Sequence, residues 1–377
     1  MGALPARIRP VTRRRLLGAA LAGVATALAS IGLTRRRRAP TVQVSTANDL
    51  LFENVRLFDG ERFLGGTRSV LVRHGTIEAI ERSGIEPAEP TRFRGGILLP
   101  GFVDAHVHLS FSEAPVVVRG GVTAVLDLGE PLDYAFSDHP PLRYRAAGPL
   151  ITAPGGYPTR SWGANGYGLE VAGEREARDA VAMLFHRGAA MIKVAIEPNA
   201  GPRLDDSMLQ TVVEAAHARK LKVAAHALGV APVRTAFGAG VDVLAHTPVE
   251  PLPDELVRAL GSAGVTVIST VRAFGDRAST RANLAALAAA GCPVVYGTDL
   301  GNDGIRPGID TAELEILTEA LGGPDEAIAA ATSGAGTLAG VGGRIAVGKP
   351  ADLIWRPADV ASLAELRRDL KVWVGGK

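Results

Sequence analysis

The chain has 377 residues, of which 47% are hydrophobic and 21% are charged, a composition that excludes an intrinsically disordered chain. The single cysteine, Cys292, excludes a disulfide scaffold and a four-cysteine zinc site. The formal net charge of +2 hides an asymmetry, because residues 1–40 hold nine of the 41 basic residues and no acidic one. The remaining 32 basic and 39 acidic residues give a mildly acidic body, so we expect no nucleic-acid partner.

Residues 1–40 resemble an export signal of the twin-arginine type. Arg13–Arg15 precede an uncharged apolar run at residues 16–33, and Ala27-Leu28-Ala29 offers a cleavage point. Arg35–Arg38 follow the run directly and resist translocation, and its 18 residues are close to the minimum for spanning a bilayer, so an uncleaved anchor stays open. We expect a protein that is exported, to the periplasm or the cell exterior, or that contacts the membrane through residues 16–33.

Residues 41–96 and 342–377 are typical of one small β-rich unit. Both stretches hold short strand-like runs without a convincing helical pattern between them, namely Leu51–Leu57, Ser69–Val72, Leu353–Trp355 and Val372–Val374. We therefore expect the two ends of the chain to build one β-sandwich beside a larger domain at residues 97–341.

The larger domain alternates strand and helix. Eight short apolar runs predict strands, at Phe102–His108, Thr123–Leu128, Pro149–Ala153, Met191–Ile196, Val223–His226, Val241–His246, Val265–Val271 and Val294–Gly297. Stretches between them have helical spacing, as at residues 205–220. Eight such units predict an α/β fold with a closed (β/α)8 TIM barrel, and an open doubly wound sheet is the alternative.

Side chains that can bind metal stand at the carboxyl ends of these runs. His106 and His108 are two residues apart in a strand, so both point to the same face. His226, His246 and Asp299 each close a later run. Because the carboxyl ends of barrel strands meet at one mouth, we expect four imidazoles and a carboxylate around one point. Imidazole and carboxylate are ordinary ligands of zinc and similar divalent ions, so the pattern predicts a metal site.

Lys193 is expected to face the same site. The branched residues of Met191–Ile196 share one face of the strand, so Lys193 lies on the other face, which is inside the barrel if the branched face packs on the helices. A buried ammonium beside metal cations is repelled and desolvated, so this lysine must be neutral or chemically changed.

Taken together, these residues resemble the amidohydrolase superfamily of metal-dependent hydrolases, in its imidazolonepropionase-like and Xaa-Pro dipeptidase-like branch. The likeness covers nearly all of residues 48–377. The residues that carry it are Leu99–His108, Gly120–Thr123, Lys193, His226, His246, Asp299 and Gly348–Ile354.

The resemblance implies a site for two divalent metal ions, expected to be zinc. The implied ligands are His106, His108 and Asp299 for the more buried ion, His226 and His246 for the more exposed ion, and Lys193, converted by carbon dioxide into a carbamate, as the bridge between the two. Asp299 would exchange a proton with a metal-bridging hydroxide that attacks the substrate carbonyl. The implied function is cleavage of an amide or peptide C–N bond in a small molecule, such as a dipeptide or an N-acyl amino acid.

Two further side chains are candidates for substrate binding. Tyr157 lies in the loop after the third strand and could hydrogen-bond or stack, and Arg272 follows the seventh strand and could hold a substrate carboxylate. Asp104 and Asp127, on the first two strands, are expected to support the metal ligands.

Two other functions stay open at this point. One is a mononuclear hydrolase or deaminase of a cyclic or heteroaromatic substrate. Gly229 disfavours deamination, because it stands three residues after His226, where deaminases of the superfamily usually place a glutamate. The other is a non-catalytic barrel that acts as a binding module, a role that usually goes with lost ligands, whereas none is lost here. The sequence also leaves open a homo-oligomer.

Overall fold

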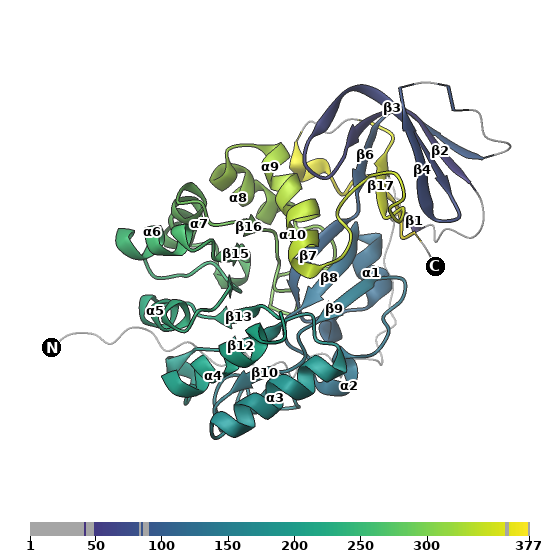
Figure 1. Ribbon diagram of the computed structural model, residues 1–377. Coiled ribbons are helices and arrows are strands. Elements are labelled where there is room, and N and C mark those ends of the chain that lie inside the picture. Colours follow the sequence, from purple (N-terminus) through teal and green to yellow (C-terminus); the bar gives the residue numbers. More distant parts are fainter. Residues whose placement is uncertain (1–40, 43–48, 83, 86–89, 359–361, 376–377) are drawn as a thin grey trace, which may run out of the picture.

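A computed structural model describes residues 41–42, 49–82, 84–85, 90–358 and 362–375. The predicted export signal at residues 1–40 lies outside the described residues. Figure 1 shows a mixed β-sheet beside a larger α/β part, with the earliest strands and the latest strands of the chain side by side in the sheet. Among the helices of the described residues, none is both long and apolar enough to cross a membrane.

The mixed sheet draws strands from both ends of the chain. Its order is β1-β18-β17-β6-β2-β3-β4, and β5 pairs with β2. The strands are β1 (Thr41–Val42), β2 (Leu50–Phe58), β3 (Phe63–Arg73), β4 (Thr76–Glu81), β5 (Thr91–Arg94), β6 (Ile97–Pro100), β17 (Leu353–Arg356) and β18 (Lys371–Trp373). The sheet therefore includes β6, beyond the expected boundary at residue 96.

Alternating side chains give this sheet two buried faces. Along β6, Leu98 packs in the sheet's own core, whereas Ile97 and Leu99 pack in the core of the α/β part. The sheet's own core is aromatic, since the Trp373 ring centroid lies 5.2 Å from that of Phe52 and 5.0 Å from that of Phe93. Because side chains alternate between the two faces of a strand, β6 contributes to both cores and holds the mixed sheet against the α/β part.

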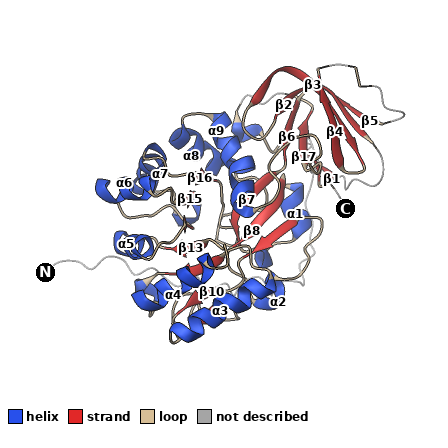
Figure 2. Ribbon diagram, in the orientation of Figure 1, coloured by secondary structure: helices blue, strands red, loops and turns tan. Residues whose placement is uncertain are grey.

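The larger part has a TIM-barrel-type α/β arrangement, with helices around parallel strands (Figure 2). Each of the eight predicted strands overlaps a strand of the structure. The larger part has these eight and also β9 and β11. Its strands are β7 (Phe102–Val107), β8 (Val122–Asp127), β9 (Arg143–Ala146), β10 (Leu150–Thr152), β11 (Gly168–Glu170), β12 (Ile192–Ala195), β13 (Val223–His226), β14 (Val243–Leu244), β15 (Thr266–Ile268) and β16 (Val294–Val295).

Helices separate most of the strands, although β9, β10 and β11 follow one another directly and three helices follow β16. The helices are α1 (Ala114–Arg119), α2 (Leu132–Ala135), α3 (Glu174–Arg187), α4 (Asp206–His217), α5 (Val230–Gly238), α6 (Asp254–Ser262), α7 (Ala278–Ala289), α8 (Thr311–Leu321), α9 (Pro324–Ala329) and α10 (Ala335–Ala339), with short 3-10 helices at η1 (Leu109–Phe111), η2 (Pro198–Ala200), η3 (Arg272–Phe274) and η5 (Leu363–Glu365) and a π-helix at η4 (Ala330–Gly334). In α4, the predicted apolar face is buried, and Asp205 caps the helix by accepting a hydrogen bond from the Met208 amide.

Parallel pairing brings the carboxyl ends of distant strands together. One sheet runs β11-β10-β12-β13-β14-β15-β16, and a second runs β7-β8-β9. Backbone hydrogen bonds join β7 to the segment after β16, from the Ala105 amide to the Tyr296 carbonyl (3.1 Å) and from the His108 amide to the Leu300 carbonyl (2.8 Å). The first and last strands are therefore neighbours, which places their ends at one site.

Candidate metal centre

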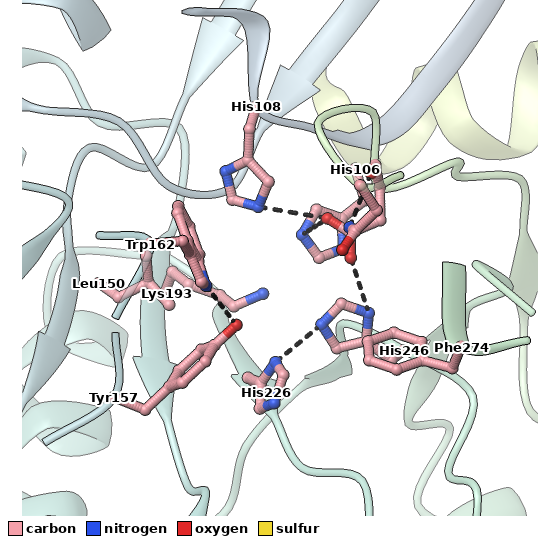
Figure 3. A pocket seen from close by; sticks show the side chains of 11 residues that line it. His106, His108, Leu150, Tyr157, Trp162, Lys193, His226, His246 and Phe274 are labelled. Atoms are coloured by element: carbon pink, nitrogen blue, oxygen red, sulfur yellow. Dashed lines mark hydrogen bonds and ion pairs between the residues drawn. The ribbon is translucent and has the colours of Figure 1, made fainter. Parts of the chain in front are cut away.

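The predicted metal ligands and Tyr157 converge on one cavity (Figure 3). His106 and His108 come from the end of β7, Lys193 from β12 and His226 from the end of β13. His246 and Asp299 follow β14 and β16. The cavity is lined by His106, His108, Leu150, Tyr157, Trp162, Lys193, His226, His246, Phe274, Asp299 and Asn302.

Asp299 lies where the first and last strands meet. Its amide donates to the His106 carbonyl at 2.7 Å, and its φ of 55° is in the left-handed region that residues other than glycine rarely adopt. The Oδ1 atom lies 3.2 Å from His108 Nε2 and 3.5 Å from His106 Nε2. This oxygen is buried, and the groups that face it are these two imidazole nitrogens. A buried carboxylate oxygen that lies close to two imidazole nitrogens can share a cation with them.

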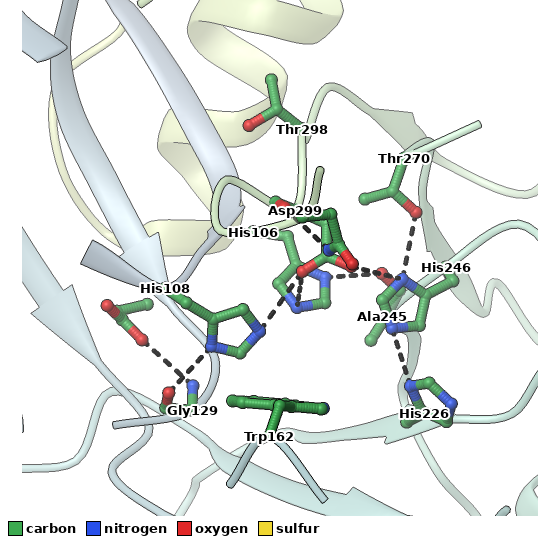
Figure 4. Close-up of polar contacts among 12 residues, drawn as sticks. His106, His108, Gly129, Trp162, His226, Ala245, His246, Thr270, Thr298 and Asp299 are labelled. Carbon is green, nitrogen blue, oxygen red and sulfur yellow. Dashed lines mark hydrogen bonds and ion pairs between the residues drawn. The ribbon is translucent and has the colours of Figure 1, made fainter. Parts of the chain in front are cut away.

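The second pair of histidines is equally close. His226 Nδ1 and His246 Nε2 lie 3.0 Å apart (Figure 4). His226 Nε2 is 3.7 Å from Glu197 Oε2, and His246 Nδ1 is 3.1 Å from the Thr270 hydroxyl. Both imidazoles are buried.

These separations fit shared coordination of a small cation. Two donors at about 2.0 to 2.1 Å from a tetrahedral zinc ion lie roughly 3.3 Å from each other. The distances from Asp299 to the β7 histidines, and between His226 and His246, fall near this value. His106, His246 and Asp299 also offer ligand atoms that all lie within 4.8 Å of one another.

Backbone carbonyls orient both β7 imidazoles. The Nδ1 of His106 lies 2.8 Å from the Ala245 carbonyl oxygen, and the Nδ1 of His108 lies 2.8 Å from that of Gly129. A carbonyl can only accept, so each Nδ1 carries a proton, and in the neutral imidazole the Nε2 lone pair faces Asp299. A side chain at position 129 would come within 2.9 Å of the His108 ring, which accounts for the glycine there.

Asp104 and Asp127 hold the ligand-bearing segments through backbone amides. Asp104 accepts from the His106 amide (3.1 Å) and from both the amide (3.0 Å) and the hydroxyl (2.5 Å) of Thr298. Asp127 accepts from the amides of Leu109 (2.8 Å) and Gly129 (3.0 Å). Asp104 therefore positions His106 and the segment that carries Asp299, and Asp127 positions the segments on either side of the His108 ring.

Burial keeps most of the imidazoles in the neutral form that binds metal. It lowers the pKa of His106 and of His246 well below the ordinary value, and it lowers the pKa of His226 as well. Burial opposes protonation of His108 too, but the Asp299 carboxylate outweighs it and raises the pKa of His108. Burial also acts against ionisation of Asp299, yet the neighbouring imidazoles, His106 first, hold its pKa well below the ordinary value.

Lys193 reaches into the cavity between the imidazoles (Figure 3). Its side chain is buried, and desolvation lowers the pKa of its ammonium to about 7. Near neutral pH a large share of this lysine is therefore the free amine, the form that can act as a nucleophile.

The two predicted substrate-binding residues are placed differently. Tyr157 lines the cavity, and its ring stacks on His226 with centroids 4.7 Å apart. Arg272 is not among the described residues that line the cavity, and its guanidinium is paired with Asp310. Its role in substrate binding stays a prediction.

Four lining residues were not predicted from the sequence, namely Leu150, Trp162, Phe274 and Asn302. The signal that could have found three of them is their position in loops that already held a candidate. Trp162 shares a loop with Tyr157, Phe274 shares η3 with Arg272, and Asn302 closely follows Asp299.

Comparison with known proteins places the chain in a family. The model of the amidohydrolase family matches residues 97–377. An uncharacterized protein of Mycobacterium bovis is 27% identical over 253 residues, or 56% of this chain and 66% of that protein. Adenine deaminase 3 of Rhizobium johnstonii is 26% identical over 243 residues, or 59% of this chain and 39% of the deaminase. These matches thus span less than two thirds of the length of either relative.

A solved Xaa-Pro dipeptidase with bound methionine in its active site shares the fold. Its TM-score is 0.70 at 21% identity, and the alignment covers 85% of this chain and 97% of the dipeptidase. The chain belongs to the amidohydrolase family, a family of metal-dependent hydrolases that act on carbon–nitrogen bonds. The resemblance inferred from the sequence is thereby confirmed, as is a TIM-barrel-type α/β fold.

Proposed function

We propose that this protein is a metal-dependent hydrolase that cleaves the C–N bond of a small amide. The observation that carries the proposal is the convergence of four imidazoles, a carboxylate and a buried lysine on one cavity, at the separations of ligands that share an ion. In this proposal His106, His108 and Asp299 would bind one divalent ion, and His226 and His246 would bind a second, as predicted from the sequence. Bound zinc would polarise the substrate carbonyl and make water acidic enough to attack it at neutral pH.

Lys193 is proposed to bridge the two ions as a carbamate. Its neutral amine would attack the carbon of carbon dioxide, form an N–C bond and release one proton to solvent. The product carries two oxygen donors and a negative charge in place of an ammonium. The lowered pKa of Lys193 supports this step, because only the free amine can react.

Asp299 is proposed to move the proton. Its carboxylate is buried, charged and next to the imidazoles, so it can accept a proton from the attacking water. It can then deliver that proton to the leaving nitrogen, which would otherwise depart as a strongly basic amide anion. Asp104 fixes this carboxylate indirectly through Thr298.

Metal stoichiometry tests the proposal. The full chain, purified without chelator and loaded with zinc in the presence of bicarbonate, is expected to bind about two zinc ions and to release amine from small amides. Elemental analysis and an amine-release assay measure both quantities. Protein that binds no zinc after this treatment would refute a metal-dependent hydrolase.

A mononuclear hydrolase or deaminase is the second candidate. The similarity to adenine deaminase 3 favours it, and so does the group His106, His246 and Asp299, which could hold a single ion. Gly229 weighs against deamination, because it stands three residues after His226, where deaminases of the superfamily usually have a glutamate. One zinc ion per chain, unchanged by bicarbonate, would support this alternative.

We also infer the finer organisation predicted from the sequence. The hydrogen bonds between β7 and the segment after β16 support a closed (β/α)8 barrel for residues 97–341, with β6 shared with the sheet. The aromatic core of the mixed sheet supports a β-sandwich built from residues 41–96 and 342–377. Twin-arginine export or membrane anchoring by residues 1–40 rests on the sequence alone.

A further inference from the structure

Aromatic rings pack against three of the four imidazoles on the cavity side. The Trp162 ring lies 4.9 Å from that of His108, the Phe274 ring lies 4.8 Å from that of His246, and Tyr157 stacks on His226. Leu150 adds a further apolar side chain. In the view of Figure 3, Trp162, Leu150 and Tyr157 lie on one side of the cavity and Phe274 on the other.

The centroids of these rings lie 4.7 to 4.9 Å from those of the imidazoles, so the apolar walls adjoin the side chains that would hold the metal. Groups beside a substrate carbonyl that reaches the metal ligands would therefore lie next to the Trp162, Tyr157 and Phe274 rings. Among the described residues, the polar groups in this wall are the Asn302 amide, whose Nδ2 donates to the Asp299 carbonyl at 3.0 Å, and the Tyr157 hydroxyl, which accepts from Trp162 Nε1 at 2.8 Å.

Arginine and lysine side chains are few in this wall. Among the described residues that line the cavity, Lys193 is the one lysine or arginine, and it lies with the four imidazoles among the proposed metal ligands. Arg272 is paired with Asp310, and Arg203, in the loop after η2, is paired with Asp206 at 2.9 Å. The Glu197 carboxylate adds negative charge near the lining residue His226, 3.7 Å from its Nε2.

These surroundings discriminate between two kinds of amide. A dipeptide or an N-acyl amino acid carries a carboxylate one carbon from the scissile nitrogen, and a buried carboxylate without a cation or a set of donors is strongly disfavoured. An uncharged aromatic group in the same place would bury apolar surface against Trp162 and Phe274 and gain ring contacts.

We propose that the substrate is an amide that carries an uncharged aromatic or other flat apolar group beside the scissile bond and no free carboxylate there. This inference rests on the proposed function and narrows its substrate class. It also replaces the role expected for Arg272, since a substrate of this class needs no guanidinium.

A matched pair of compounds tests the proposal. N-propionyl-2-phenylethylamine and N-propionyl-phenylalanine share the acyl group, the amide and the phenyl ring, and they differ by one carboxylate. For the zinc-loaded full chain, the neutral compound is expected to have a kcat/KM at least about tenfold higher. Equal or faster hydrolysis of N-propionyl-phenylalanine would overturn the inference.

Binding separates this inference from the proposed function. If zinc-loaded protein hydrolyses neither compound, titration calorimetry measures their dissociation constants directly. At least about tenfold tighter binding of the neutral compound would then support the apolar pocket even though the hydrolytic function fails for this pair. Comparable binding of the two, or no measurable binding of the neutral compound, would overturn it.

Two variants locate the effect in the cavity wall. Trp162→Ala and Phe274→Ala are each expected to lower kcat/KM, or affinity, for the neutral compound about tenfold. Phe274→Ala is the second variant because Trp162 also donates a hydrogen bond to the Tyr157 hydroxyl at 2.8 Å. Phe185→Ala is the matched control, because this aromatic side chain lies on α3 and is exposed. If both cavity variants keep the full preference of the wild type, the walls do not select the substrate.

Discussion

Arg143 joins the α/β part to the mixed sheet, and its loss should be costly. It lies on β9, and its guanidinium pairs with Asp352 just before β17, both through Nε and through Nη2, the latter at 3.1 Å from Oδ1. Nη2 also donates to the Gly375 carbonyl. Asp352 is buried, and its Oδ1 accepts a further hydrogen bond from the Gly375 amide at 2.8 Å. The perturbation is Arg143→Met, which keeps an apolar stem and removes the charge.

The expected cost follows from the exposure of the two partners. Breaking a fully buried ion pair by removing one partner costs about 3 to 5 kcal/mol, because the other charge is left uncompensated. The Arg143 side chain is 30% exposed while that of Asp352 is 5% exposed, so water can reach part of the site. We therefore expect the free energy of unfolding to fall by about 2 to 3 kcal/mol at neutral pH.

The pH dependence of this cost has a definite sign. Burial already raises the pKa of Asp352, against the effect of Arg143, and removal of the guanidinium must raise it further. An acid whose folded pKa lies above its unfolded pKa lowers stability at pH values where the unfolded state is ionised, and this penalty disappears as the pH falls through the unfolded pKa. The destabilisation by Arg143→Met should therefore be smaller at pH 5 than at pH 7.

Urea unfolding followed by circular dichroism measures these differences for wild type, Arg143→Met, Asp352→Asn and the double variant. The cycle isolates the interaction between the two side chains. Arg143→Met should cost much less in the Asp352→Asn background than in the wild type. A cost within about 0.5 kcal/mol of zero at pH 7, or one that grows as the pH falls, would refute the reasoning.

Three further predictions concern the site and the sheet. Asp299→Asn should lower kcat/KM by at least about 100-fold in an amine-release assay, because the proton carrier is lost; near-normal activity would contradict its role. Lys193→Met should reduce the zinc content of bicarbonate-treated protein from about two ions per chain toward one, as elemental analysis can determine, and an unchanged content would contradict the carbamate bridge. Trp373→Ala, which removes a buried ring from the aromatic core of the sheet, should lower the free energy of unfolding by about 3 to 5 kcal/mol; in urea unfolding, a loss below about 1 kcal/mol would contradict that packing.

The strands and their polar ends could be predicted because both depend on local patterns. The runs that end in His226 and His246 are short, apolar and bounded by turns, and the structure has β13 and β14 there. Once the strands are assumed to alternate with helices, topology alone brings their carboxyl ends together. Lys193 follows from the same logic, since the faces of a strand alternate.

What could not be predicted depends on partners far away in the chain. Arg272 at a strand end could serve as a substrate anchor, but its guanidinium lies against Asp310, which also caps α8 by accepting from the Ala312 and Glu313 amides. No local pattern reveals that pairing. Trp162 and Phe274 were missed for a related reason, because the direction of a loop side chain is set by the packing of its neighbours.

The geometry of the metal centre depends on the hydrogen bonds that join β7 to the segment after β16. Asp104 on β7 binds Thr298, 194 residues later, and the Asp299 amide binds the His106 carbonyl. Asp299 therefore approaches His106 and His108 only when these hydrogen bonds between the first and last strands have formed. An ion held by these three residues would bind the folded chain and not the unfolded one, and it would stabilise the fold by RT ln(1 + [L]/Kd). The same hydrogen bonds that join the strands thus also place the ligands, so loss of Asp104 should weaken metal binding without removing any ligand.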